Sequence, residues 1–187
     1  MSVTASALQA IYANGDDPWH FATSPYEQEK FRATRAALSH DRYEAALELG
    51  CGNGALARHL APLCNSYTGL DAVETALLAA QSALPQGRFI QGFLPCALPT
   101  TRFDLIVLSE ILYFLDADEI TDLARDIEGR WPRAELLCVS YLGNTSHALS
   151  GEQSLACFTA AMPTRRFTLL RRTQGYRIDR ATGADHA

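Results

Sequence analysis

Short apolar runs alternate with segments of helical periodicity along most of the chain, beginning at residue 44. Continuous apolar runs of about four to eight residues indicate buried strands, and apolar residues spaced three and four apart indicate amphipathic helices. This pattern predicts strands at 44–50, 66–72, 88–92, 103–110 and 134–143. It predicts helices at 55–64, 73–85, 116–131 and 150–162, with a proline-rich loop at 93–102.

Local signals strengthen several of these predictions. Ser150 is followed three residues later by Gln153, which predicts a capping box at the start of a helix. The helix expected at 116–131 begins with acidic residues, which are favourable at the positive end of the helix dipole. Residues 103–110 are apolar on both faces, as is typical of a central strand in a parallel sheet.

The residue pattern near the C-terminal end of the chain predicts a β-hairpin. Residues 167–173 and 176–182 are two strand-like runs joined around Gln174 and Gly175. Strands that alternate with helices form parallel sheets with helices on both faces, so we expect a doubly wound α/β fold. The hairpin would add one antiparallel strand to this mostly parallel sheet.

Residues 1–40 fall outside the alternation. They contain an aromatic-rich loop, DDPWHFATSPY, followed by a helical pattern, YEQEKFRATRAALS. Open α/β sheets bind ligands at the carboxyl ends of their strands, so we interpret this segment as a lid over that edge. The expected organisation is a single domain, 1–187, with an N-terminal helical lid (1–40) and a Rossmann-like core (41–187).

Composition indicates one globular domain and excludes several classes of protein. The chain has 187 residues, 48% hydrophobic and 20% charged, which excludes a disordered or collagen-like protein. No apolar run reaches the roughly 18 residues of a transmembrane helix, and no secretory signal is visible. The five cysteines are odd in number and never form CxxC, so we expect reduced thiols, no metal site and a cytoplasmic location.

The charge balance bears on the choice of partner. The net charge of −5 argues against nucleic acid as the main partner, because phosphate binding requires a basic surface. It is compatible with a small neutral or cationic substrate. Arginines nevertheless crowd the C-terminal end of the chain, at Arg165, Arg166, Arg171, Arg172, Arg177 and Arg180. We interpret them as the solvated edge of the hairpin, protected by charge from edge-to-edge pairing; a surface for an acidic partner is the alternative.

A glycine-rich loop, Glu48-Leu49-Gly50-Cys51-Gly52-Asn53-Gly54, follows the first predicted strand and leads into a helix. Glycines at this place allow the backbone to turn sharply and to approach a ligand closely. Asp71 ends the second strand, where its carboxylate could accept hydrogen bonds from both hydroxyls of a ribose. The same residues fit two cofactor-binding motifs. One is the dinucleotide-binding pattern GxGxxG/A, with Ala55 at its last position, and the other is the ExGxGxG loop that binds S-adenosylmethionine.

Three further features favour S-adenosylmethionine over a nicotinamide cofactor. Glu48 stands two residues before the first glycine, where it suits a cationic amino-acid group and disfavours a pyrophosphate. A dehydrogenase needs a second mononucleotide half and usually a catalytic domain, and 187 residues leave no room for both. The fourth strand ends in Ser109-Glu110-Ile111-Leu112-Tyr113-Phe114, which brings a polar pair and aromatic residues to the ligand crevice.

These motifs resemble those of class I S-adenosylmethionine-dependent methyltransferases, and specifically those of the nodulation protein S (NodS) family. The resemblance is carried by DDPWHFATSPYEQEKFRATRAAL (16–38), ALELGCGNGALARHLAP, FDLIVLSEILYFL and HALSGEQ (147–153). It covers nearly the whole chain and implies a seven-stranded sheet with the last strand antiparallel. It also implies a methyltransferase that uses S-adenosylmethionine.

The resemblance assigns the parts of the cofactor site to individual residues. The loop residues implied to cradle the methionine part are Glu48, Gly50, Cys51, Gly52 and Gly54. Asp71 would hold the ribose, Ala72 and the backbone near Gly92 would flank the adenine, and the Ser109 carbonyl would accept from the cofactor's amino group.

Three further positions complete the expected cofactor site. Phe93 stands where such enzymes often carry an aspartate that binds the adenine amine. Adenine recognition is therefore expected to rest on backbone groups and apolar packing. Lys30 is expected to reach the cofactor carboxylate, and Trp19 to form part of the pocket wall.

Members of the NodS family methylate the amine of a deacetylated glucosaminyl end on a chitooligosaccharide, so the resemblance implies an amine acceptor. An amine must be neutral to react, and a nearby carboxylate or imidazole can take its proton. The candidate catalytic residues are Glu110 for that proton, Tyr113 for orienting the amine, and His147 in the loop beside the same crevice. Phe21 and Tyr26 could stack on a sugar ring.

The expected partner is a small-molecule or oligosaccharide acceptor, with no nucleic acid and no membrane. Other functions remain open at this point. An O-, S- or carboxyl-methyltransferase of another small molecule is one alternative. A nicotinamide-dependent oxidoreductase and a non-catalytic module that binds S-adenosylmethionine are the others.

Overall fold

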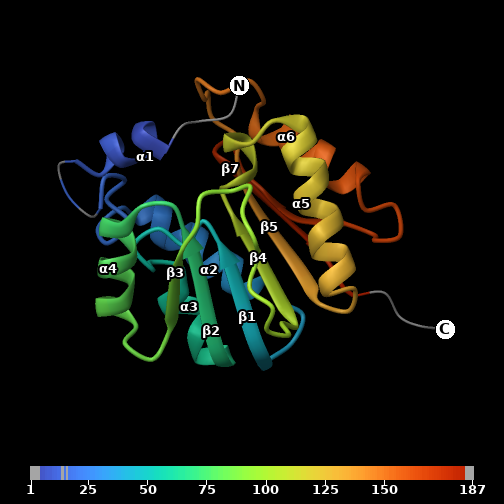
Figure 1. Ribbon diagram of the computed structural model, residues 1–187, viewed down its shortest axis with the longest axis horizontal. Coiled ribbons are helices and arrows are strands. Elements are labelled where there is room, and N and C mark those ends of the chain that lie inside the picture. Colours follow the sequence, from blue (N-terminus) through green and yellow to red (C-terminus); the bar gives the residue numbers. More distant parts are fainter. Residues whose placement is uncertain (1–4, 14, 16, 184–187) are drawn as a thin grey trace.

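The computed structural model describes residues 5–13, 15 and 17–183, which form one sheet flanked by helices (Figure 1). The strands are β1 (Tyr43–Leu49), β2 (Cys64–Asp71), β3 (Arg88–Gln91), β4 (Leu105–Ser109), β5 (Glu135–Tyr141), β6 (Thr168–Arg172) and β7 (Tyr176–Ala181). The helices are α1 (Ala5–Ile11), α2 (Pro25–Ala36), α3 (Ala57–Leu60), α4 (Glu74–Ala83), α5 (Ala117–Arg130) and α6 (Gly151–Ala160). Two 3-10 turns, η1 (Ala61–Leu63) and η2 (Leu112–Phe114), complete the elements.

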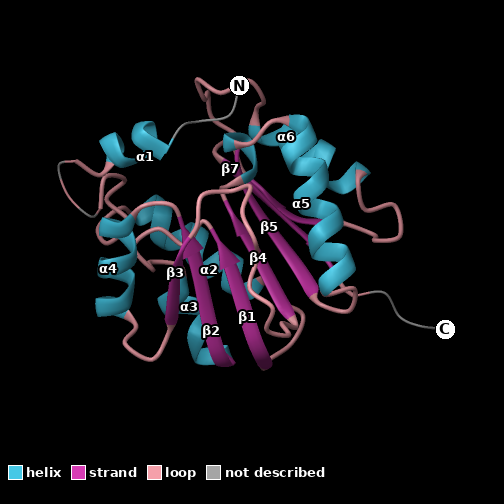
Figure 2. Cartoon of the chain, viewed as in Figure 1, coloured by secondary structure: helices cyan, strands magenta, loops and turns pink. Residues whose placement is uncertain are grey.

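The sheet has seven strands in the order β3-β2-β1-β4-β5-β7-β6, and helices lie on both of its faces (Figure 2). The first five strands in this order pair in parallel, whereas β7 runs antiparallel to both of its neighbours. The predicted α/β class, the seven strands and the antiparallel last strand are therefore confirmed. The direction of winding reverses between β1 and β4, and open α/β sheets bind ligands outside the carboxyl ends at such a point.

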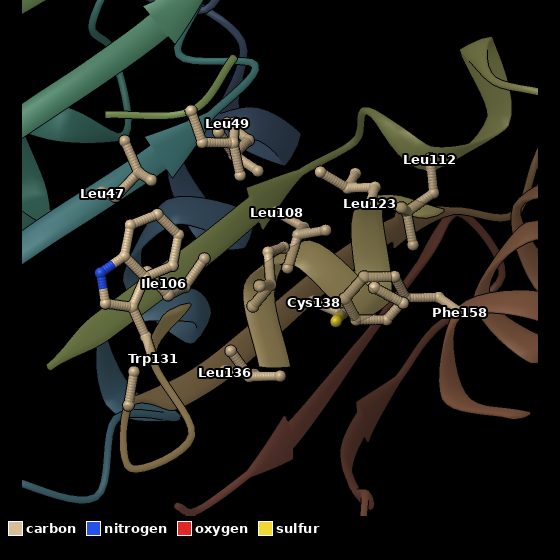
Figure 3. Packing of buried hydrophobic residues seen from close by; sticks show 14 of the residues in the cluster. Leu47, Leu49, Ile106, Leu108, Leu112, Leu123, Trp131, Leu136, Cys138 and Phe158 are labelled. Atoms are coloured by element: carbon tan, nitrogen blue, oxygen red, sulfur yellow. The ribbon is translucent and has the colours of Figure 1, made fainter. Parts of the chain in front are cut away.

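Both faces of the sheet are covered by apolar side chains, because successive residues of a strand point to opposite faces. On one face, Leu47 and Leu49 of β1 and Leu108 of β4 share a cluster with Leu123 of α5 and Phe158 of α6 (Figure 3). On the other face, the alternate residues of β1 and β4 pack in a cluster with residues of α2 and α3. This double burial explains why the sequence around β4 is apolar at every position.

Capping boxes begin two of the helices. At α5, Asp116 accepts a hydrogen bond from the Glu119 N–H at 3.1 Å, and the Glu119 side chain accepts from the Asp116 N–H at 2.9 Å. Ser150 and Gln153 form the same arrangement at α6, which confirms the capping box predicted there. No helix within the described residues combines the length and the apolar character needed to cross a membrane.

The prediction of a helix over 55–64 is wrong in length, because the observed α-helix is much shorter. α3 has only four residues, the 3-10 turn η1 follows it, and Cys64 already opens β2. The reason is Pro62, which has no N–H to donate and whose ring clashes with the carbonyl four residues earlier in an α-helix. The chain therefore leaves the α-helix at Ala61 and returns directly to the sheet.

α2 lies in the segment predicted as a lid, yet it is packed into the core. Ser24 caps it by accepting a hydrogen bond from the Glu27 N–H at 3.3 Å, and Pro25 occupies its first turn, where a missing N–H is tolerated. Phe31 and Ala33 are buried in the same apolar cluster as residues of β1 and α3. The division into a lid at 1–40 and a core at 41–187 stays a prediction.

The arginines of the C-terminal hairpin lie along a charged edge. β6 is an edge strand whose residues are all exposed. Its Arg171 pairs with Glu29 of α2 at 2.9 Å, and Arg172 pairs with Glu152 of α6. This arrangement agrees with the interpretation that charge blocks edge-to-edge pairing.

Arg165 differs from the other arginines because it is buried. Its guanidinium donates to the carbonyls of Trp131, Pro132 and Ala134 at 2.9, 3.0 and 2.6 Å, and it pairs with Glu128. These carbonyls follow the end of α5, where backbone groups lack partners within the helix. The interpretation of the arginine cluster as a solvated edge is therefore wrong for Arg165.

Arg165→Ala is expected to lower the free energy of unfolding by about 2–4 kcal/mol, because it removes a buried guanidinium that donates to three backbone carbonyls and pairs with the Glu128 carboxylate. Arg166→Ala, at the exposed neighbouring position, is the matched control and should change it by less than about 0.5 kcal/mol. Urea denaturation followed by circular dichroism measures both values. Equal effects of the two substitutions would contradict the role assigned to Arg165.

Candidate active site

A cavity of about 580 Å³ lies at the carboxyl ends of β1, β2, β4 and β5. Its volume is within the range of about 300–1,000 Å³ that is typical of sites for small molecules. α1 and the loop that follows β5 lie along the same edge of the sheet (Figure 1). The tertiary structure brings the predicted site residues together here, since all of them except Gly54 line this cavity.

The glycine loop after β1 has positive φ at Gly50 (80°) and at Gly52 (50°). A Cβ on Gly50 would lie 2.8 Å from the carbonyl oxygen of Ser109, so only glycine lets the loop pass the end of β4. A Cβ on Gly52 would meet the Tyr12 hydroxyl at 3.4 Å and the Phe21 ring at 3.9 Å, both in residues that line the cavity. Gly52 therefore places its backbone beside two residues of the cavity wall, and its positive φ rather than a lack of space favours glycine there.

Cys51 and Gly54 contribute packing contacts to the same loop. Cys51 lines the cavity but is 4% exposed, and burial raises the pKa of its thiol. Gly54 has φ of 77°, and a Cβ there would lie 3.0 Å from the Cα and Cβ atoms of Ala80 in α4. Gly54 therefore packs closely on α4 and does not line the cavity, and its contact with a cofactor stays a prediction.

Asp71 lies at the end of β2 with its carboxylate against the glycine loop. Its Oδ2 accepts a hydrogen bond from the Gly52 N–H at 2.8 Å, and its Oδ1 accepts from the Val73 N–H at 3.0 Å. Burial raises the pKa of Asp71, and these backbone hydrogen bonds oppose the rise. Each carboxylate oxygen has a second lone pair, so Asp71 can bind ligand hydroxyls while it holds the loop.

Glu48 is fully buried near the end of β1, next to the cavity. Its carboxylate accepts a hydrogen bond from the Tyr67 hydroxyl at 2.8 Å. Burial raises the pKa of Glu48 to about 8, although hydrogen bonds from Tyr67 and Ser109 act in the opposite direction. The carboxyl is therefore largely protonated at neutral pH, and an approaching cation would favour its ionised form.

Ala72, Gly92 and Phe93 line the part of the cavity beside β2 and β3. The Gly92 N–H donates to the Asp71 carbonyl at 2.9 Å, and the Gln91 side chain donates to the Ala72 carbonyl at 3.2 Å. Phe93 is 37% exposed and presents an apolar ring. This part of the cavity therefore offers apolar contact, and the Gly92 amide is already engaged by the backbone.

Lys30 is buried in the cavity wall and does not lie on the surface. Its Nζ is 2.8 Å from Oε2 of Glu27 and 2.8 Å from Oε2 of Glu110, and it lies 5.4 Å from the centre of the Tyr26 ring. Two carboxylates therefore already hold this ammonium, and its contact with a cofactor carboxylate stays a prediction. Sequence reasoning missed Glu27 as a site residue; its spacing of three from Lys30 on a helix is the signal that could have found it.

Glu110 directly follows β4 and has φ of 52°, a region that residues other than glycine rarely adopt. Its Oε2 accepts a hydrogen bond from Lys30, whereas its Oε1 is buried and has no hydrogen-bond partner among the described residues. Burial raises the pKa of Glu110, the Lys30 ammonium opposes this rise, and the Glu27 carboxylate adds to it. Backbone strain and a buried polar group in a cavity wall together mark a candidate functional residue.

Tyr113 and His147 stack on each other in the cavity wall, with ring centroids 5.6 Å apart and an angle of 15° between the planes. Phe114 lies 4.8 Å from His147. Burial raises the pKa of the Tyr113 hydroxyl and lowers the pKa of His147. Both side chains are therefore uncharged at neutral pH and can act as hydrogen-bonding groups.

An aromatic wall closes the cavity on the N-terminal side. Trp19 is 41% exposed and lies 5.4 Å from Tyr12, edge to face, and 5.4 Å from Phe21 in a stacked arrangement. Tyr12 is a cavity residue that sequence reasoning missed. The apolar spacing of Leu8, Ile11 and Tyr12, which all line the cavity, is the signal that could have indicated it.

The arrangement combines a glycine loop held by a carboxylate, apolar walls, and a cluster of two carboxylates around one ammonium. The first feature suits a ligand with vicinal hydroxyls, and the last suits a group that donates hydrogen bonds or carries positive charge. No group of three or more His, Cys, Asp or Glu side chains in the described part of the chain is arranged to hold a metal ion.

Comparison with known proteins gives two kinds of match. The model of the family Nodulation protein S (NodS) matches residues 7–128. Nodulation protein S of Bradyrhizobium diazoefficiens is 35% identical over 106 residues, which are 54% of this chain and 50% of that protein. The protein of the same name from Sinorhizobium fredii is 32% identical over 105 residues, 54% of this chain and 49% of that protein. The chain thus spans about half the length of the curated relatives that it matches.

Solved structures share the whole fold. The crystal structure of N-methyltransferase NodS from Bradyrhizobium japonicum, in complex with S-adenosyl-L-homocysteine, aligns with a TM-score of 0.80 at 22% identity. The alignment covers 97% of this chain and 98% of that one. A putative methyltransferase from Pseudomonas syringae aligns with a TM-score of 0.72 at 29% identity, over 84% of this chain and 98% of that one.

The resemblance predicted from the motifs is confirmed by these matches. The family model includes the glycine loop, Asp71 and the end of β4, whereas the segment 147–153 lies outside it and its resemblance stays a prediction. Because the family model covers more than half of the sequence, the chain belongs to the nodulation protein S family.

Proposed function

We propose that the protein is an S-adenosylmethionine-dependent methyltransferase that acts on the amine of a small molecule or an amino sugar. The observation that carries the cofactor part is Asp71, whose carboxylate holds the Gly52 N–H at 2.8 Å while both residues line the cavity. Membership of the nodulation protein S family supports the same cofactor, as does the fold shared with an N-methyltransferase bound to S-adenosyl-L-homocysteine.

The residues of the cavity fit this cofactor. Gly50 and Gly52 would lie beside its methionine part, Asp71 would accept hydrogen bonds from its ribose hydroxyls, and Phe93 would pack on its adenine. The Glu48 carboxyl, with a pKa of about 8, could become charged as the cofactor's ammonium approaches. When bound, the cofactor supplies a methyl group on a positively charged sulfur, and an amine nitrogen takes this methyl as the carbon–sulfur bond breaks.

The chain's own residues would prepare the acceptor. An amine reacts through its lone pair, so an acceptor that arrives as an ammonium must first lose a proton. Glu110 can take this proton at Oε1, which is buried and has no partner among the described residues. Tyr113 and His147 can orient the nitrogen by hydrogen bonds, and the aromatic walls can exclude water.

The charge of the cavity is the observation that favours an amine over an oxygen, sulfur or carboxylate acceptor. Two carboxylates, Glu27 and Glu110, share the single ammonium of Lys30 there. Such a cluster attracts a cation and repels a carboxylate. An acceptor that carries an ammonium therefore fits this part of the cavity better than a neutral or anionic one.

S-adenosyl-L-homocysteine is expected to raise the midpoint of thermal unfolding by a few degrees, because a ligand that binds only the folded state stabilises it. NAD should leave the midpoint unchanged, since its pyrophosphate would find no free cationic side chain among the described cavity residues, where Lys30 is already paired with two carboxylates. Differential scanning fluorimetry with each ligand measures both shifts. Equal shifts with the two ligands, or no shift with either, would contradict the cofactor assignment.

Asp71→Ala is expected to weaken the binding of S-adenosyl-L-homocysteine by roughly 10- to 100-fold, because charge-assisted hydrogen bonds contribute about 1.5–3 kcal/mol. Asp104→Ala is the matched control. Asp104 also accepts hydrogen bonds from two backbone N–H groups, those of Glu44 and Ala45, at 2.8 Å each. It lies at the amino-terminal ends of β1 and β4, opposite the strand ends that border the cavity. Calorimetric titration should find unchanged affinity in the control; similar losses in both variants would show that Asp71 acts only through stability.

A screen with a methyl-labelled cofactor is expected to transfer the label to amines, including deacetylated chitooligosaccharides, because the Glu27–Lys30–Glu110 cluster selects cations. The panel should also contain thiols, carboxylates and sugar hydroxyls, with the methylated atom identified by mass spectrometry. Transfer only to oxygen, sulfur or a carboxylate would contradict the amine part of the proposal. Cofactor binding without transfer to any acceptor would favour a non-catalytic module.

A further inference from the structure

Glu27, Lys30 and Glu110 form a buried cluster that joins α2 to the end of β4. Lys30 Nζ lies 2.8 Å from one oxygen of each carboxylate. The exposed fractions of the three side chains are 4% for Lys30, 11% for Glu27 and 20% for Glu110. All three residues line the cavity, so an acceptor beside Glu110 would meet the cluster as a unit.

The cluster carries more negative than positive charge. One ammonium faces two carboxylates, and Glu110 Oε1 has no hydrogen-bond partner among the described residues. A buried carboxylate oxygen without a donor is unfavourable, because its lost hydration is not compensated. A ligand that brings an ammonium to Oε1 would remove this deficit.

The other titratable side chains around the cluster do not supply the missing positive charge. They are Tyr26 of α2, Tyr113 after β4 and Tyr141 of β5. Burial raises the pKa of Tyr26 to about 12 and also raises the pKa of Tyr113, so both stay neutral near pH 7. His147 stacks on Tyr113, and burial lowers its pKa, so it is neutral as well.

We propose that Glu27 and Lys30 are positioning residues that act through Glu110. In this proposal Lys30 holds Oε2 of Glu110 against the cavity wall, and Glu27 takes a share of the Lys30 charge. Glu110 Oε1 is then left free to bind the acceptor ammonium and to accept its proton. The proposal rests on the proposed function, because it assumes that an amine acceptor binds beside Glu110.

The division of one positive charge between two carboxylates sets the strength of Glu110 as a base. Lys30 lowers the pKa of Glu110, whereas Glu27 raises it. With Lys30 alone, Glu110 would be a weaker proton acceptor; with Glu27 alone, it would be protonated too readily. In the proton transfer, one N–H bond of the ammonium breaks, its electron pair stays on nitrogen, and the proton forms an O–H bond with Oε1.

The first test measures the titration of Glu110 without any acceptor. The protein is labelled with 13C at the glutamate carboxyl carbon, and the resonance that disappears in Glu110→Gln is assigned to Glu110. Glu27→Gln is expected to move its titration to lower pH, because a neighbouring negative charge is lost. Lys30→Met is expected to move it to higher pH, by about 1 to 3 units, because a neighbouring positive charge is lost.

The second test measures methyl transfer against pH, with one deacetylated chitooligosaccharide as acceptor for every variant. The rate should fall as pH decreases through the pKa of Glu110, because the protonated carboxyl cannot take a proton. The acid limb of the pH–rate profile should therefore move to lower pH in Glu27→Gln and to higher pH in Lys30→Met. The acceptor is the same throughout, so differences between variants report on the protein.

Glu29→Gln is the matched control, on the same helix but exposed and paired with Arg32 and Arg171. It should leave the titration of Glu110 and the pH profile unchanged. Identical titration of Glu110 in the wild type and in Glu27→Gln overturns the proposal, even if Lys30→Met does not fold. A shifted titration with an unshifted rate profile also overturns it. Absence of transfer to any acceptor would instead contradict the proposed function and leave the measured coupling intact.

Discussion

The passage of the glycine loop across the end of β4 is the contact on which the rest of the site depends. Gly50 lies so close to Ser109 that a Cβ would stand 2.8 Å from its carbonyl oxygen. The missing side chain lets the loop turn at Gly52, whose N–H is then held by Asp71 at the end of β2. Three neighbouring strands are tied together at this edge, and the cavity lies where they end.

Electrostatic contacts complete the cavity by joining segments that are far apart in the chain. The hydrogen bond from Lys30 to Glu110 spans 80 residues of sequence. An exposed ion pair contributes little to stability, whereas removing one partner of a buried pair leaves a charge without compensation. α2 therefore has two roles: Phe31 packs into the core behind the sheet, and Lys30 and Glu27 extend into the cavity.

Regular elements were predictable because their signals are local. The apolar run of β4 and the capping box at Ser150 each depend on a few consecutive residues, and the structure has both. The helix predicted at 55–64 is longer than the one in the structure, because Pro62 ends the α-helical hydrogen-bond pattern that the apolar spacing favours. The sequence does not distinguish the buried Arg165 from the exposed arginines near it, because a basic residue in a basic cluster gives no sign of the carbonyls that it contacts in the folded chain.

The sequence by itself determined the order of strands and helices, the glycine loop with Asp71, and the resemblance to a methyltransferase family. These depend on periodicity, turn chemistry and short motifs, which are properties of neighbouring residues. Only the tertiary structure decided that Lys30 is held by Glu110, 80 residues away in the sequence, and that Gly54 packs on α4. Ion-pair partners and packing contacts depend on which surfaces meet in space and lose their water, and no local pattern encodes that.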